Sequence, residues 1–146
     1  KVGDKAPLFE ALAQDGQVLK LAAMKGEKVI LYFYPRDSTP TCTIQACNFR
    51  DNYELLQKEG YTVWGVSVDG EKSHQKFIAK HELPFDLIVD TEKKVHNLYG
   101  TWGEKKTFGK TYMGTKRTTF VIDEQGLISK IIKKVKSKEH TQQIFE

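Results

Sequence analysis

The chain has 146 residues, a formal net charge of +4, a sequence pI near 8.9 and a mean hydropathy of −0.51. This length can bury a full core and no Pro/Gly/Ser-rich linker divides it, so we expect a single domain over residues 1–146. The longest apolar run, residues 29–34, is far shorter than the roughly 20 residues of a membrane-spanning helix, and the first ten residues lack the apolar stretch of a signal peptide. These features favour a soluble protein over a membrane protein, and we expect a cytoplasmic one.

Apolar periodicity alternates between strand and helix along the chain. The predicted strands are residues 28–34, 61–68, 86–89, 117–123 and 127–135, and the predicted helices are residues 40–58, 71–81, 92–99 and 137–145. Residues 124–126 form a hairpin turn between the last two strands. This alternation predicts the α/β class, with a central mixed β-sheet flanked by helices on both faces.

The break between the first strand and the first helix carries the strongest chemical signal. After the polar residues 35–38, Thr39 occupies an N-cap position and Pro40 the first helical position, where its missing N–H costs nothing. Cys42 follows in the first turn, where unpaired N–H groups and the helix dipole stabilise a thiolate. We therefore expect a nucleophilic thiol, with a buried, inert cysteine as the alternative.

The second cysteine, Cys47, lies five residues further along the same predicted helix. Five residues of α-helix separate two Cα atoms by about 8.5 Å, whereas a disulfide requires less than about 7 Å. The two thiols cannot bridge while both residues stay helical. A redox cycle between them would therefore be coupled to local unwinding. Two cysteines so close suit a cytosolic redox pair better than the disulfide framework of a secreted domain.

Pro35, Thr39 and Cys42 form the pattern P-x-x-x-T-x-x-C within the block LYFYPRDSTPTCTIQACNFRD. This pattern resembles the signature of the peroxiredoxins, and the whole block is similar to their Q-type or bacterioferritin-comigratory-protein subfamily. Two later blocks follow the order of segments in this subfamily: VWGVSVDGEKSHQKFIAKHELPFDLIVD and LYGTWGEKKTFGKTYMGTKRTTFVIDEQG. The resemblance covers almost the whole chain.

Three positions depart from the subfamily. The chain has Thr41 and Asn48 where the family often has Gly, and Gln45 where it often has Glu. The missing glycines bear on how readily this helix unwinds, because glycine is the residue that most favours the unfolded backbone.

The resemblance implies a thioredoxin-like fold and a thiol-dependent peroxidase that reduces hydrogen peroxide and organic hydroperoxides. It implies that Cys42 is the peroxidatic cysteine and forms a sulfenic acid, and that Cys47 is the resolving cysteine and forms an intramolecular disulfide with it. Thioredoxin or a similar dithiol donor would reduce this disulfide. The Q-type resemblance also implies a monomer.

Three further residues complete the expected site. In the family, the arginine before the T-F-V-I-D segment approaches the peroxidatic cysteine, and here it is Arg117; a surface arginine at a strand end is the alternative. The Thr39 hydroxyl and the Cys42 backbone N–H would hold the peroxide oxygens in line. Pro35 would shield the thiolate, a role compatible with simply terminating a strand.

Two function classes stay open. One is a cysteine peroxidase, and the other is a thioredoxin-fold redox-signalling or disulfide-exchange protein without peroxide turnover. Thr39 and Arg117 favour the peroxidase because disulfide exchange requires neither. A general thiol–disulfide oxidoreductase usually carries C-x-x-C, which this chain lacks. The segment GVSVD resembles a nucleophile elbow without its closing glycine, so hydrolase chemistry is disfavoured.

The sequence predicts neither a metal nor a bound cofactor. The four histidines show no ligand spacing with one another or with the cysteines, so surface or cap histidines are expected: His74, His81, His96 and His140. No phosphate loop or dinucleotide-binding glycine pattern occurs.

Two other features invite an interpretation. The lysines of residues 130–138 alternate with apolar residues, so we expect a solvated face that protects a sheet edge, not a nucleic-acid site. The glycine-rich aromatic stretch 99–114 predicts a long loop, in which Trp102 and Phe108 either line the active site or pack in the core.

Overall fold

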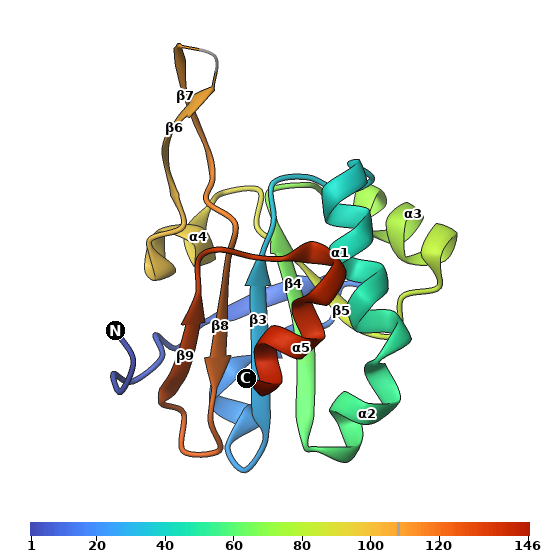
Figure 1. The fold of residues 1–146 in the computed structure, drawn as a ribbon, viewed down its shortest axis with the longest axis vertical. Coiled ribbons are helices and arrows are strands. Elements are labelled where there is room, and N and C mark those ends of the chain that lie inside the picture. Colours follow the sequence, from blue (N-terminus) through green and yellow to red (C-terminus); the bar gives the residue numbers. More distant parts are fainter. Residues whose placement is uncertain (108) are drawn as a thin grey trace.

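The computed structural model describes residues 1–107 and 109–146, which form a seven-stranded sheet covered by helices on both faces and a separate two-stranded ribbon (Figure 1). The strands are β1 (Glu10–Ala13), β2 (Val18–Lys20), β3 (Lys28–Phe33), β4 (Tyr61–Ser67), β5 (Asp86–Val89), β6 (Trp102–Thr107), β7 (Lys110–Thr115), β8 (Thr118–Ile122) and β9 (Ile128–Ile132). The helices are α1 (Pro40–Asp51), α2 (Tyr53–Lys58), α3 (Glu71–His81), α4 (Lys94–Tyr99) and α5 (His140–Phe145), with 3-10 turns η1 (Leu21–Met24) and η2 (Ser137–Glu139).

The large sheet has the order β2-β1-β5-β4-β3-β8-β9 and is mixed. Strands β3, β4 and β5 pair in parallel, while β1, β8 and β9 join them in antiparallel pairs. Strand β3 lies near the centre and is buried on both faces, which explains its unbroken apolar sequence. The predicted α/β class and mixed sheet are therefore confirmed.

Alternating side chains of β3 divide the core between the two faces of the sheet. Ile30 and Tyr32 belong to a cluster with α1, α3 and α5 that includes Cys42. Leu31 and Phe33 belong to a second cluster with Val95 of α4 and with β8. Figure 1 shows α1, α3 and α5 on one side of the sheet and α4 on the other. The thiol of interest therefore faces the α1 side of the core.

The predicted helix of residues 40–58 is two helices. Asn52 interrupts it with φ −110° and ψ 13°, and its side-chain amide donates a hydrogen bond to the carbonyl of Asn48 at 2.8 Å. Asparagine side chains compete with helical backbone bonds in this way. Strand β9 also ends earlier than predicted, at Ile132.

The stretch predicted as a long loop is the β6–β7 ribbon. It rises away from the body of the molecule (Figure 1), and Tyr112 and Met113 on it are exposed. Trp102 packs on the α4 side, 6.0 Å from the His96 ring and beneath the Lys93 ammonium. Phe108 lies outside the described residues.

The prediction of surface or cap histidines is wrong for three of the four: His74, His96 and His140 are fully buried. Each is accommodated because both ring nitrogens have hydrogen-bond partners. His81 is half-buried against the Phe77 ring.

The basic stretch near the C-terminus is only partly a solvated face. Lys130 donates hydrogen bonds to the carbonyls of Gln143 and Ile144, both at 3.1 Å, and so caps the end of α5. Lys133, Lys134, Lys136 and Lys138 are exposed as predicted. Among the described helices, none has the length and apolar content needed to cross a membrane.

Candidate active site

Cys42 lies at the start of α1, as predicted. Thr39 is the N-cap residue with an extended backbone, and Pro40 is the first helical residue. The first helical hydrogen bond runs from the Thr43 N–H to the Thr39 carbonyl at 2.9 Å. The Cys42 N–H precedes this ladder and points out of the helix end. Its side chain is only 1% exposed, so the sulfur is largely shielded from bulk water.

The Thr39 hydroxyl donates a hydrogen bond to the Arg36 carbonyl at 3.0 Å and does not cap the helix. Its one proton is therefore committed, and the oxygen is left to accept. A peroxide O–H is a donor that such an oxygen can orient.

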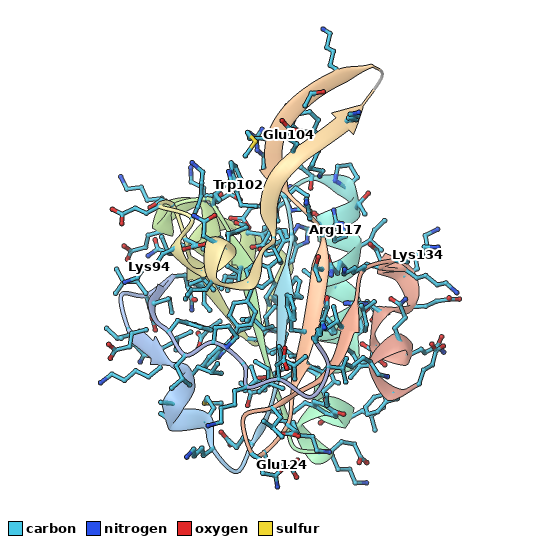
Figure 2. All side chains as sticks on the ribbon, turned by 90° about the vertical axis from the view of Figure 1, so that its left-hand side faces the viewer. Lys94, Trp102, Glu104, Arg117, Glu124 and Lys134 are labelled. Atoms are coloured by element: carbon cyan, nitrogen blue, oxygen red, sulfur yellow. The ribbon has the colours of Figure 1, made fainter. Side chains whose placement is uncertain are left out.

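Arg117 connects this helix start to the sheet. It directly precedes β8, whose Thr118 pairs with Phe33 at the end of β3, and Figure 2 shows it where the ribbon joins the body. One guanidinium nitrogen donates to Cys42 Sγ at 3.1 Å and the other to Gln45 Oε1 at 2.6 Å. The structure thus brings together two residues that are 75 positions apart in the sequence.

The charge of Arg117 is directed at the sulfur. Its second partner, Gln45, is a neutral amide and cannot offset the positive charge. A guanidinium that bonds a sulfur directly stabilises the anionic form of that sulfur. The Gln45 Nε2 is buried and has no hydrogen-bond partner among the described residues. From the sequence, Gln45 was noted only as a departure from the family and was given no role, although its place three residues after Cys42 puts the two on one helix face.

Two buried tyrosines of the preceding strand stay neutral beside this site. Burial raises the pKa of Tyr32 well above its usual value, and the charges of Asp37 and Cys42 raise it further. Burial likewise raises the pKa of Tyr34, with Tyr32 and Asp37 adding to the effect. The site therefore has uncharged phenols behind it, and Arg117 provides the cation at the sulfur.

The remaining predicted residues lie nearby in the chain. Pro35 follows β3 and is half-buried, which suits a strand terminator. Cys47 lies in α1, half-buried, and both cysteines are free thiols. This agrees with the spacing argument that an intact helix keeps them apart. Within the described residues, no group of three or more His, Cys, Asp or Glu side chains is placed to hold a metal.

Comparisons with known proteins agree with this geometry. Residues 2–131 match the model of the AhpC/TSA family. A putative peroxiredoxin bcp of Coxiella burnetii is 48% identical over 144 residues, covering 99% of this chain and 95% of that protein. Peroxiredoxin Bcp of Bacillus subtilis is 44% identical over 146 residues, covering 100% of this chain and 93% of that protein.

Solved structures show the same fold. A Xanthomonas campestris bacterioferritin comigratory protein, described with alkyl peroxide reduction activity, has a TM-score of 0.87 and 31% identity, covering 93% of this chain and 87% of that one. A Xylella fastidiosa PrxQ mutant has a TM-score of 0.92 and 26% identity, covering 99% of this chain and 92% of that one.

A shielded thiol at a helix start, bonded to a guanidinium and carried on a thioredoxin-like sheet, defines the class of thiol-dependent peroxidases. The chain belongs to the AhpC/TSA family, and its predicted resemblance to the Q-type or bacterioferritin-comigratory peroxiredoxins is confirmed. It is a peroxidase that acts on peroxides with a dithiol reductant, and its two cysteines fit the atypical 2-Cys type. The alternative of disulfide exchange without peroxide turnover is not supported.

Proposed function

We propose that Cys42 is the peroxidatic cysteine. Its thiolate attacks the nearer oxygen of hydrogen peroxide or an organic hydroperoxide, an S–O bond forms and the O–O bond breaks. The sulfur is oxidised to a sulfenic acid, and the departing oxygen takes a proton and leaves as water or alcohol. The observation that carries this proposal is the 3.1 Å hydrogen bond from Arg117 to Cys42 Sγ at a helix start.

The surrounding groups position the peroxide and stabilise the developing charge. The Thr39 oxygen accepts from the peroxide O–H, and the Cys42 N–H donates to a peroxide oxygen. Arg117 lies beside the sulfur, where its charge also favours a departing anionic oxygen. Pro35 offers no N–H and shields the thiolate.

Cys47 is the resolving cysteine in this scheme. After the first turns of α1 unwind, its thiolate attacks the sulfenic sulfur, an S–S bond forms and the S–O bond breaks. The departing hydroxide takes a proton and leaves as water. A dithiol reductant then restores both thiols, and thioredoxin is the proposed donor. We further propose that the enzyme works as a single-domain monomer over residues 1–146, in the cytoplasm, where thiols are kept reduced.

The proposal is tested by following NADPH consumption with thioredoxin, its reductase and peroxide. Wild-type protein should turn over, and Cys42→Ser should reduce turnover to the background of the assay because the nucleophile is gone. Undiminished turnover in Cys42→Ser would contradict the assignment of the peroxidatic cysteine.

The resolving role has its own measurement. One equivalent of peroxide added to the reduced protein should consume both thiols and lower the intact mass by two hydrogens. In Cys47→Ser the same treatment should leave a sulfenic acid, detectable with a dimedone-type probe. A wild-type sulfenic acid that persists with Cys47 still titratable would contradict resolution by Cys47.

A further inference from the structure

Asp37 is a buried carboxylate in the loop between β3 and α1. Its side chain accepts three hydrogen bonds: from the Tyr34 hydroxyl at 2.5 Å, the Ser73 hydroxyl at 2.8 Å and His74 Nδ1 at 2.7 Å. The Asp37 side chain is 1% exposed and that of His74 is 0% exposed. Two of the three donors belong to α3, so the carboxylate fastens the loop to that helix.

The hydrogen positions in this cluster follow from its partners. His74 Nε2 lies 2.8 Å from the Ile88 carbonyl, which can only accept, so this nitrogen carries a proton. A further proton lies between His74 Nδ1 and Asp37 Oδ2. Burial raises the pKa of Tyr34, which therefore keeps its proton and donates it to Asp37. All the polar atoms of the cluster are satisfied without water.

The backbone of the same residue is fastened as well. The Asp37 N–H donates to Asp69 Oδ2 at 2.7 Å, and the Ser67 hydroxyl donates to that same oxygen at 2.8 Å. Asp37 is therefore fixed through its side chain and its backbone to α3 and to the end of β4. We call this set of bonds the Asp37 clamp.

The clamp lies directly upstream of the reacting groups. Thr39 is two residues after Asp37, and Cys42 is five residues after it. Ser38, between Asp37 and Thr39, lies in the left-handed region at φ 64°. A serine stays in that region only where its surroundings fix it. The clamp supplies that fixation, because it holds the residue before Ser38.

We propose that Asp37 is a positioning residue of the peroxide reaction. Its clamp holds Thr39 and the Cys42 N–H where the peroxide binds. The clamp also stabilises the helical conformation of the first turn of α1 relative to the unwound conformation. The inference rests on the proposed function of Cys42. A weaker clamp should slow the attack of Cys42 on peroxide, accelerate the formation of the Cys42–Cys47 disulfide, and make the midpoint potential of that couple more negative. A general destabilisation of the fold is not expected to slow the oxidation of Cys42 while accelerating the formation of the disulfide.

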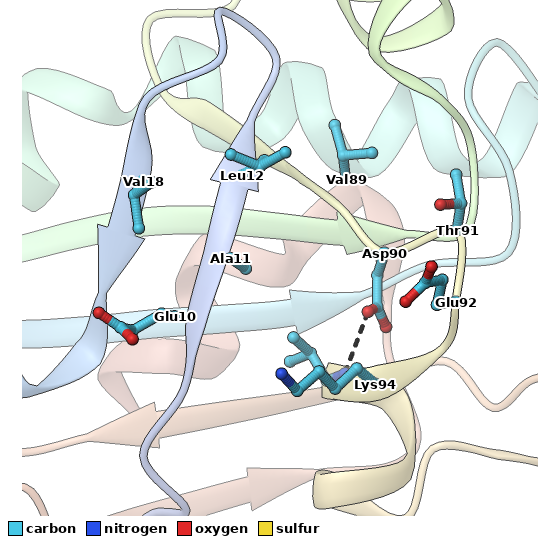
Figure 3. A pocket seen from close by; sticks show the side chains of 10 residues that line it. Glu10, Ala11, Leu12, Val18, Val89, Asp90, Thr91, Glu92 and Lys94 are labelled. Atoms are coloured by element: carbon cyan, nitrogen blue, oxygen red, sulfur yellow. Dashed lines mark hydrogen bonds between the residues drawn. The ribbon is translucent and has the colours of Figure 1, made fainter.

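The chain offers a matched control in a second buried Asp–His pair. Asp90 accepts hydrogen bonds from the Val95 N–H at 3.0 Å, and from the His96 N–H at 2.9 Å and His96 Nδ1 at 2.6 Å. It directly follows β5 and bonds the first turn of α4, whose Val95 packs on the opposite side of the sheet from Cys42, and it lines a hollow formed with β1 (Figure 3). Asp90→Asn keeps the backbone N–H that bonds the Ser67 carbonyl and removes a second buried carboxylate whose side-chain bonds run to α4, not to the loop before Cys42.

The test compares wild-type, Asp37→Asn and Asp90→Asn proteins by rapid mixing with hydrogen peroxide. In Asp37→Asn, sulfenic acid formation should slow about tenfold or more, disulfide formation should accelerate, and the potential measured against glutathione should become more negative. Asp90→Asn should leave both rates within about twofold of wild type.

An unchanged rate of sulfenic acid formation in Asp37→Asn overturns the inference, and so does equal slowing in Asp90→Asn. If Asp37→Asn does not fold, Tyr34→Phe removes one clamp donor while keeping the ring, and an unchanged rate in that variant overturns the inference equally. Wild-type oxidation at a thiol other than Cys42 would instead refute the proposed function.

Discussion

At the scale of single residues, the guanidinium of Arg117 does what a lysine could not do. It bonds Cys42 Sγ and Gln45 Oε1 at once through two nitrogens in a fixed plane. An ammonium is a point charge and cannot reach both partners in that geometry. The fork therefore fixes the direction of the positive charge as well as supplying it.

Arg117→Lys should slow oxidation of Cys42 by peroxide about 10- to 100-fold, since charge is kept but alignment is lost. Stopped-flow measurement of sulfenic acid formation checks this, with the exposed neighbour Lys116→Ala as a control that should match wild type. A rate within twofold of wild type in Arg117→Lys would show that charge alone is sufficient.

At the scale of elements, the segment that the proposed resolution by Cys47 would unwind is fixed at both ends. Upstream lies the Asp37 clamp, and downstream lies Asn48, the residue after Cys47. The Asn48 side chain donates to the Lys138 carbonyl at 2.8 Å and accepts from the Thr141 N–H at 2.8 Å and the Thr141 hydroxyl at 2.7 Å. These bonds tie α1 to η2 and α5, which confines the expected unwinding to the residues between Asp37 and Asn48.

Asn48→Ala should therefore loosen α1 in two measurable ways. Because the Thr141 N–H loses its acceptor, the free energy of unfolding should fall by about 1–3 kcal/mol. Disulfide formation after peroxide treatment should accelerate, because α1 is freer to unwind. Asn97→Ala, an exposed position in α4, serves as a control and should change the unfolding energy by less than about 0.5 kcal/mol. Slower disulfide formation in Asn48→Ala would contradict this account.

The sequence predicted the elements whose own residues form a clear apolar pattern. Strand β3 is an unbroken apolar run, and α3 was predicted with its observed bounds. The ribbon β6–β7 was missed because it is rich in lysine, threonine and glycine and pairs mainly with itself. The thiol at the helix start was predictable from its local sequence. The Asp37 clamp was not, because its partners Ser73 and His74 lie 36 and 37 residues away and meet it only in the folded chain.

At the scale of the whole molecule, the C-terminal helix stabilises the active-site helix through an uncharged histidine. The His140 ring packs 4.9 Å from that of Phe49 in α1. Its Nδ1 donates to Gln143 Oε1 at 2.8 Å, so its Nε2 accepts from the Thr119 hydroxyl at 2.7 Å. Burial lowers the pKa of His140 to about 4; the charge of Arg117 also lowers it, and the Gln143 bond acts in the opposite direction.

This depressed pKa predicts how stability depends on pH. The unfolded chain binds a proton at His140 below about pH 6.5, whereas the folded protein does so only near pH 4. The neutral His140 therefore contributes fully to stability above pH 6.5, and this contribution of about 3 kcal/mol is lost as the pH falls towards 4.

Urea unfolding of wild type and His140→Gln at pH 7.5, 6 and 4.5 measures this loss of unfolding free energy. The wild-type stability should fall more steeply than that of the variant, and parallel curves would show that His140 does not titrate with folding. Since α5 packs on α1, acid should loosen the active-site helix together with the C-terminal helix.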